Sequence, residues 1–163
     1  MKKGKTMVII RHAKSSWEEE EKNDFDRALK PKGINDIVRI AGETKTLLGE
    51  IDVVFSSSAN RAVHTAILFA KAVGIPTEKI SIVDDLYETN EVIVLNFVRA
   101  LDNNLGTVAI IGHNPTLTDF ANLFVDEQID NIPTSGLVRI DFREDCWENI
   151  SKKNVNKVTV RFP

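Results

Sequence analysis

Short apolar runs alternate along this chain with segments whose apolar residues recur at helical spacing. The runs are too short to be helices and indicate buried β-strands, and they cover residues 6–11, 51–55, 80–83 and 107–111. The helical segments cover residues 34–48, 59–73, 91–101 and 115–124. Alternation of strand and helix is typical of a parallel sheet built from βαβ units. The pattern therefore predicts an α/β fold.

The last part of the chain has a different pattern. Residues 136–142 and 155–162 alternate apolar and polar side chains, as strands with one exposed face or at a sheet edge do. We therefore expect a three-layer α/β/α sandwich, in which a mainly parallel sheet has an antiparallel edge. The length of 163 residues suits one domain with a substantial core, so we expect residues 1–163 to form a single domain.

Local signals predict one helix face and one helix start. In residues 91–101, Val92, Leu95 and Val98, with the neighbouring Phe97, are expected in the core. Asn114 is placed to cap the helix that follows it, with Pro115 at the first helical position.

Composition narrows the classes of function. The net charge of −3 argues against binding to nucleic acid or to an anionic membrane. The single Cys146 excludes an intrachain disulfide and a cysteine-rich metal site. Three lysines near the start precede an apolar run that ends at Arg11, which is too short for the core of a signal peptide. No stretch approaches the roughly 20 apolar residues that span a bilayer. We expect a cytoplasmic protein.

Three predicted strands end in residues that suit an anion. Arg11-His12 follows the first strand, Arg61 comes just after the second, and His113 follows the fourth. Ligands bind at the carboxyl ends of strands in open α/β sheets. Two guanidinium groups and two imidazoles around one small volume would repel unless an anion lies between them, and phosphate matches their donors.

Five segments, in this order along nearly the whole chain, together resemble the histidine phosphatase superfamily, the phosphoglycerate-mutase-like group, and within it the SixA-like branch. The segments are Arg11-His12-Ala13, Asp24-Phe25-Asp26-Arg27-Ala28-Leu29 with Gly33, Ser57-Ser58-Ala59-Asn60-Arg61-Ala62 with Thr65-Ala66, Gly112-His113-Asn114-Pro115, and Pro133-Thr134-Ser135-Gly136.

The resemblance implies a site and a reaction. His12 corresponds to a nucleophile that attacks phosphorus through an imidazole nitrogen, giving a phosphohistidine intermediate that water hydrolyses. Arg11, Arg61 and His113 correspond to the groups that stabilise the charge on the phosphoryl oxygens. The scheme needs no metal and no cofactor, and the spacing of the three histidines indicates no metal site.

Two further residues are candidates for the site, and each has an alternative explanation outside the chemistry. Ser15 is a candidate phosphate donor, and local hydrogen bonding within a turn explains it equally well. Glu88 stands in the region where mutases of the family carry a glutamate acid and base. The local sequence differs from the mutase pattern, so an ordinary solvated acid is an equal alternative for Glu88, and Asp84 and Asp85 are similar candidates.

We therefore predict hydrolysis of phosphohistidine or of phosphomonoesters on a phosphorylated protein or a small phosphorylated metabolite. The alternatives are a broad small-molecule phosphomonoesterase and a non-catalytic module that binds phosphoproteins. The intact His12 argues against the module, because binding needs the cations but not a nucleophile. Trp17 and Trp147 are expected to be packing residues, and the four glutamates at residues 18–21 a solvated run.

Overall fold

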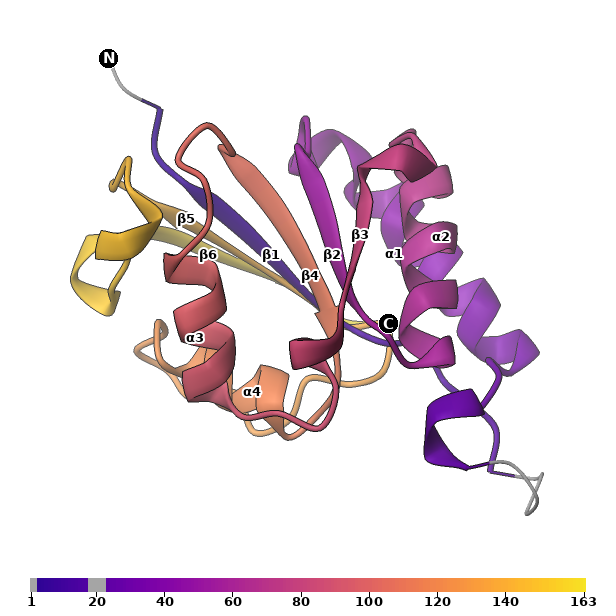
Figure 1. Ribbon diagram of the computed structural model, residues 1–163. Coiled ribbons are helices and arrows are strands. Elements are labelled where there is room, and N and C mark those ends of the chain that lie inside the picture. The colour runs from indigo at the N-terminus through magenta and orange to yellow at the C-terminus, as the bar shows by residue number, and fades with distance from the viewer. Residues whose placement is uncertain (1–2, 18–22) are drawn as a thin grey trace.

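The computed structural model describes residues 3–17 and 23–163, and the four glutamates at residues 18–21 lie outside them (Figure 1). The described residues contain a six-stranded sheet of order β3-β2-β4-β1-β5-β6. Its strands are β1 (Thr6–Arg11), β2 (Val53–Ser57), β3 (Ile80–Val83), β4 (Thr107–Gly112), β5 (Leu137–Phe142) and β6 (Val155–Arg161). The first four run parallel, and β5 and β6 pair antiparallel at one edge. The predicted fold class is confirmed.

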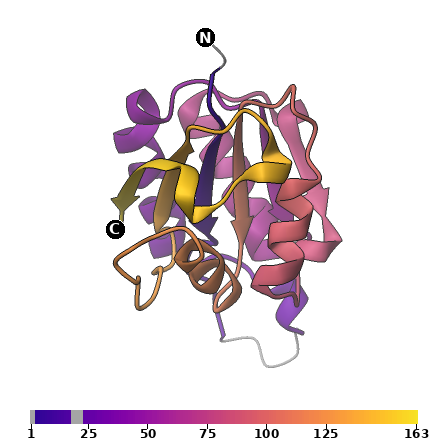
Figure 2. The same cartoon turned by 90° about the vertical axis from the view of Figure 1, so that its left-hand side faces the viewer.

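Helices cover both faces of the sheet (Figures 1 and 2). Helices α1 (Pro31–Leu48) and α2 (Asn60–Val73) pack on one face, and α3 (Glu91–Arg99) and α4 (Thr116–Asn122) on the other. Alternate residues of a strand point to opposite faces, so the side chains of β1 divide between two core clusters. Ile10 belongs to the cluster under α1 and α2, and Ile9 to the cluster under α3 and α4.

Strand order brings the three predicted motifs together. In the sheet β4 lies between β2 and β1, and all three strands are parallel. Their carboxyl ends therefore meet at one edge of the sheet, in the lower middle of Figure 1. Arg11, Arg61 and His113 stand at or just beyond these three ends.

Helix α1 begins three residues earlier than the apolar pattern predicts. It starts at Pro31, because the fixed φ of proline suits the first helical position. The first turn also contains Gly33, where a Cβ would lie 2.3 Å from the carbonyl oxygen of Lys14. Glycine at this position lets the helix approach the backbone just after the Arg11-His12 motif.

The predicted core face of helix α3 is confirmed except at Val92. Val98 is buried, and Leu95 and Phe97 are partly buried against the same core cluster, as expected. Val94 is buried as well, whereas Val92 is 57% exposed. Residues 94 and 98 lie one helical turn apart and both face the sheet, whereas Val92 lies on the opposite side of the helix.

Helix α4 begins at Thr116, after Pro115, rather than at Pro115 itself. The predicted cap is partly right, because the side-chain oxygen of Asn114 accepts the backbone N–H of Thr118 at 3.2 Å. No helix among the described residues is long and apolar enough to cross a membrane.

Candidate active site

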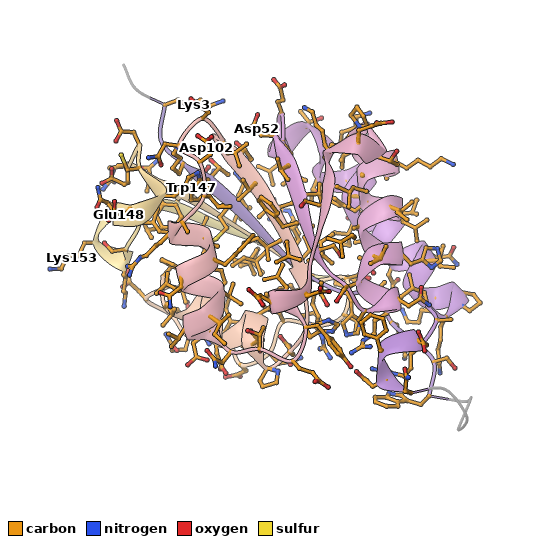
Figure 3. The ribbon with its side chains drawn as sticks, in the orientation of Figure 1. Lys3, Asp52, Asp102, Trp147, Glu148 and Lys153 are labelled. Carbon is orange, nitrogen blue, oxygen red and sulfur yellow. The ribbon has the colours of Figure 1, made fainter. Side chains whose placement is uncertain are left out.

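A cavity of about 610 Å³ opens at the carboxyl ends of β1, β2 and β4. Its lining includes all six residues predicted for the site, which are Arg11, His12, Ser15, Arg61, Glu88 and His113. Asp52 and Asp102 mark the opposite end of the sheet in Figure 3. The structure thus brings the predicted residues into one cavity.

The His12 ring is held in one orientation by its own backbone neighbour. Its Nδ1 atom lies 2.8 Å from the carbonyl oxygen of Ala13, which can only accept, so Nδ1 carries the proton. Nε2 is then left with a lone pair. Burial is the largest cause that lowers the pKa of His12 to about 3, and the charges of Arg61 and Arg11 act in the same direction. A neutral imidazole with a free Nε2 is a competent nucleophile.

His113 lies beside His12, with ring centroids 5.2 Å apart. Its Nε2 atom lies 2.7 Å from Oγ of Ser57, and its Nδ1 atom is buried without a hydrogen-bond partner. Burial, followed by the charge of Arg61, lowers the pKa of His113 to about 4. Sequence reasoning did not assign Ser57 to the site, although it lies in the segment that leads to Arg61.

The two predicted arginines are anchored by backbone carbonyls. Arg61 is 5% exposed, and one of its terminal nitrogens donates to the carbonyl oxygen of Asp24 at 2.6 Å. Arg11 donates to the carbonyl oxygen of Ile132 at 3.0 Å. The Nε atoms of both arginines are buried without a partner in the protein. A bound oxyanion offers the acceptors that such donors need.

A third arginine in the cavity was not predicted. Arg27 is 9% exposed and donates to Oγ of Ser15 at 2.9 Å and to Oδ1 of Asp24 at 3.1 Å. Ser15 therefore accepts from Arg27 and keeps its own O–H proton as a donor. The signal for Arg27 was present in the segment of residues 24–29, which carries part of the family resemblance.

The sequence prediction for Trp17 was wrong. It was expected to be a packing residue, but it is 72% exposed and lines the cavity. The guanidinium carbon of Arg27 lies 3.5 Å from the centre of the indole ring. Stacking on a cation holds the ring in place without burying it.

Glu88 lies at the mouth of the cavity on the connection between the 3₁₀ turn η3 (Asp84–Leu86) and α3. Its side chain is exposed, and its backbone has a φ of 48°, which is uncommon for a residue other than glycine. The alternative candidates Asp84 and Asp85 are not among the lining residues. Of these three acids, Glu88 is the one that lines the cavity.

The cavity combines neutral imidazoles with three guanidinium groups, which suits transfer of a phosphoryl group. Potential metal ligands are grouped elsewhere: within the described part of the chain, the one cluster of three is Glu144, Asp145 and Cys146, outside the lining.

Comparison with known families agrees with this chemistry. The family model of the histidine phosphatase superfamily (branch 1) matches residues 7–91, which is more than half of the chain. The chain belongs to this superfamily. The matched part of this histidine phosphatase includes His12, Arg61 and Glu88, whereas His113 lies beyond it.

Relatives and solved structures extend the likeness over nearly the whole histidine phosphatase chain. The protein ML1117 of Mycobacterium leprae is 25% identical and covers 94% of this chain and 99% of its own length. The protein Rv1276c of Mycobacterium tuberculosis is 29% identical over 78% of this chain and 84% of its own.

The similar solved structures include proteins named SixA. The protein assigned as the phosphohistidine phosphatase SixA of Agrobacterium tumefaciens superposes with a TM-score of 0.82, at 25% identity over 98% of this chain and 99% of that one. The protein histidine phosphatase SixA complexed with tungstate has a TM-score of 0.76, at 20% identity over 94% and 95%. At 20% identity, the likeness to the tungstate complex shows a shared fold.

Proposed function

We propose that this histidine phosphatase removes the phosphoryl group from phosphohistidine on proteins, with His12 as the nucleophile. The observation that carries the proposal is the contact of His12 Nδ1 with the Ala13 carbonyl oxygen, 2.8 Å away, which leaves Nε2 free in a cavity lined by three arginines. A module that only binds phosphate needs those arginines but has no use for a nucleophile held in this way.

The reaction has two steps. In the first, the lone pair of His12 Nε2 bonds to phosphorus as the bond from phosphorus to the leaving nitrogen or oxygen breaks. The leaving group departs with that electron pair and takes up a proton. In the second, water attacks phosphorus, the bond to Nε2 breaks, and phosphate and a proton are released. Arg11, Arg61 and His113 stabilise the charge on the phosphoryl oxygens in both steps.

The substrate assignment rests on two observations. The likeness to the SixA protein of Agrobacterium tumefaciens covers both chains almost completely. In addition, Trp17 lines the cavity and is 72% exposed, so its ring offers a contact to a residue on a protein surface. The second candidate is a broad phosphomonoesterase for small metabolites. The position of Glu88 favours it, because an alkoxide leaving group needs a proton donor.

The wider proposal is one catalytic domain over residues 1–163, active without a metal. Arginine side chains take the electrostatic role that a metal ion has in other phosphatases. A cytoplasmic location stays a prediction from the sequence.

The test compares wild type, His12→Ala and His64→Ala on a phosphohistidine protein, an aryl phosphate and an alkyl phosphate, with and without a chelator. His64 lies on α2 and is not among the residues that line the cavity, so it serves as the matched control. We expect wild type and His64→Ala to release phosphate at similar rates, unaffected by the chelator. His12→Ala is expected to lose at least about a thousandfold in turnover.

A denaturing quench in base during turnover of labelled aryl phosphate is expected to leave base-stable, acid-labile phosphate on wild type and none on His12→Ala. Undiminished turnover by His12→Ala would remove His12 as the nucleophile. Faster turnover of alkyl phosphates than of phosphohistidine would favour the second candidate.

A further inference from the structure

Asp24 connects three parts of the cavity wall. It lies in the 3₁₀ turn η1 (Asp24–Asp26), and its Oδ2 atom accepts from Arg61 at 3.0 Å and from the hydroxyl of Tyr87 at 2.9 Å. Its Oδ1 atom accepts from Nε of Arg27 at 3.1 Å. One carboxylate therefore links an arginine of α2, an arginine after η1 and the tyrosine after η3.

This carboxylate is a negative charge in a cavity that is built for anions. Partial burial opposes its ionisation, but the hydrogen bond from Tyr87 and the charge of Arg61 outweigh that effect and hold the pKa of Asp24 below its usual value. Asp24 therefore stays ionised near neutral pH, and it is a poor proton donor. The chemistry proposed for His12 gives it no role as an acid.

The contacts of Asp24 fix both the position and the direction of two guanidinium groups. Arg61 donates to the backbone carbonyl of Asp24 as well as to its carboxylate, so it is tied to η1 at two points. Arg27 is tied at one end to Asp24 and at the other to Ser15. The Nε atom of Arg61 is buried without a partner and is one of the donors that this arrangement leaves for a ligand.

We propose that Asp24 is a positioning residue of the phosphoryl site. Its carboxylate orients Arg61 and Arg27 for the transition state, and its charge weakens the binding of free phosphate so that product leaves. The proposal rests on the phosphatase function proposed above. Orientation acts on the transition state and charge acts on the bound product, so the two effects are separable in kinetics.

The turn that carries Asp24 has other anchors, so substitution of its side chain leaves the turn in place. Asn60 donates to the carbonyl oxygens of Asp26 and Arg27 at 3.3 and 3.4 Å. Phe25 packs edge-to-face on Tyr87, with ring centroids 5.2 Å apart. The substitution Asp24→Asn keeps one acceptor oxygen and removes the charge, whereas Asp24→Ala removes both.

Asp26 supplies a matched control. It lies in the same turn, is exposed, and is not among the residues that line the cavity. Asp26→Asn removes the same charge from the same turn without touching the arginines. Any effect of net charge alone is therefore shared by the two variants.

The experiment measures kcat on an aryl phosphate and the inhibition constant of inorganic phosphate, at low and high salt. For Asp24→Asn we expect kcat to fall about tenfold, because charge-assisted hydrogen bonds to two arginines are weakened. We expect phosphate to bind about three- to tenfold more tightly, with a smaller gain at high salt. Asp24→Ala is expected to lose roughly a hundredfold in kcat, and Asp26→Asn to stay within about twofold of wild type in both measurements.

Three results would overturn the proposal: an unchanged kcat in Asp24→Asn, weaker phosphate binding together with the loss of kcat, or equal effects of Asp24→Asn and Asp26→Asn. The second is the pattern of a residue that only supports the fold.

Calorimetric titration with inorganic phosphate tests the role of Asp24 without relying on phosphatase activity. If wild type turns over no substrate, the proposed function fails, and the phosphate affinities alone then decide the role of Asp24. Tighter binding by Asp24→Asn than by wild type and Asp26→Asn supports it, and equal binding overturns it.

Discussion

The Nε2 atom of His113 lies 2.7 Å from the Oγ atom of Ser57, on the neighbouring strand β2. Oγ of Ser57 also accepts the backbone N–H of Ala59 at 3.3 Å, and within the described part of the chain Nε2 of His113 is the acceptor within reach of its own proton. Nδ1 of His113 is then the protonated nitrogen, and it is buried without a partner in the protein. A phosphoryl oxygen is the acceptor that this N–H fits.

Replacement of Ser57 by alanine is expected to lower kcat about tenfold, because the His113 ring loses the contact that selects its tautomer. Ser56 supplies the matched control: it is equally buried on the same strand, and its hydroxyl donates to the Ser57 carbonyl oxygen. Steady-state kinetics on an aryl phosphate compare the two variants. Equal losses in Ser57→Ala and Ser56→Ala would show that the strand, not the histidine, is affected.

In the absence of phosphate, acid is expected to destabilise the folded protein through the two histidines of the cavity. In the unfolded chain both histidines bind a proton once the pH falls below their ordinary pKa of 6.5. In the folded protein His12 and His113 bind one only when the pH nears their lowered pKa values of about 3 and 4. The free energy of unfolding therefore falls as the pH decreases through this interval.

Urea denaturation at pH 6.5 and 4.5 measures this effect. Wild type is expected to lose up to about 2–3 kcal/mol more than His12→Ala between the two pH values. Equal losses in the two proteins would contradict the neutral state of His12.

Glu88→Gln tests the role of the acid at the cavity mouth. Protonation by a general acid is worth roughly 10²–10⁴ in rate for a strongly basic leaving group. Imidazole, with a pKa of about 6.5, needs little such help. We therefore expect Glu88→Gln to slow hydrolysis of alkyl phosphates strongly, and that of phosphohistidine or an activated aryl phosphate very little.

The measurement is the relative rate across leaving groups of rising basicity. Asp85→Asn is the control, because Asp85 lies three residues away and outside the lining. A flat profile for Glu88→Gln would remove Glu88 from the acid role.

Two glycines of α1 are expected to respond in opposite directions to alanine. At Gly33 a Cβ would lie 2.3 Å from the Lys14 carbonyl oxygen, so Gly33→Ala is expected to destabilise the protein by roughly 1–3 kcal/mol. At Gly42 nothing lies within 4 Å, and Gly42→Ala is expected to stabilise it by about 0.5–1 kcal/mol. Urea denaturation measures both, and a stabilising Gly33→Ala would show that the Lys14 backbone has room to move.

Local pattern was enough to place most elements and the residues at their ends. The apolar run of β1 and the Arg11-His12 pair after it are adjacent in sequence, so the chain itself determines that the pair stands at a strand end. Helix boundaries were less accurate, as at Pro31, because that helix start depends on the fixed φ of proline and on the close approach of Gly33 to Lys14, which apolar spacing does not record.

Only the tertiary structure determined which residues of different loops contact one another in the cavity wall. Asp24 meets Arg61 across 37 residues and Tyr87 across 63, and neither contact follows from any local period. Both depend on the order in which β3, β2, β4 and β1 pair, since that order sets which loops share an edge of the sheet. Sequence spacing determines which face or end a side chain occupies. Contacts between residues of different loops are determined only when the strands that precede those loops pair in the sheet.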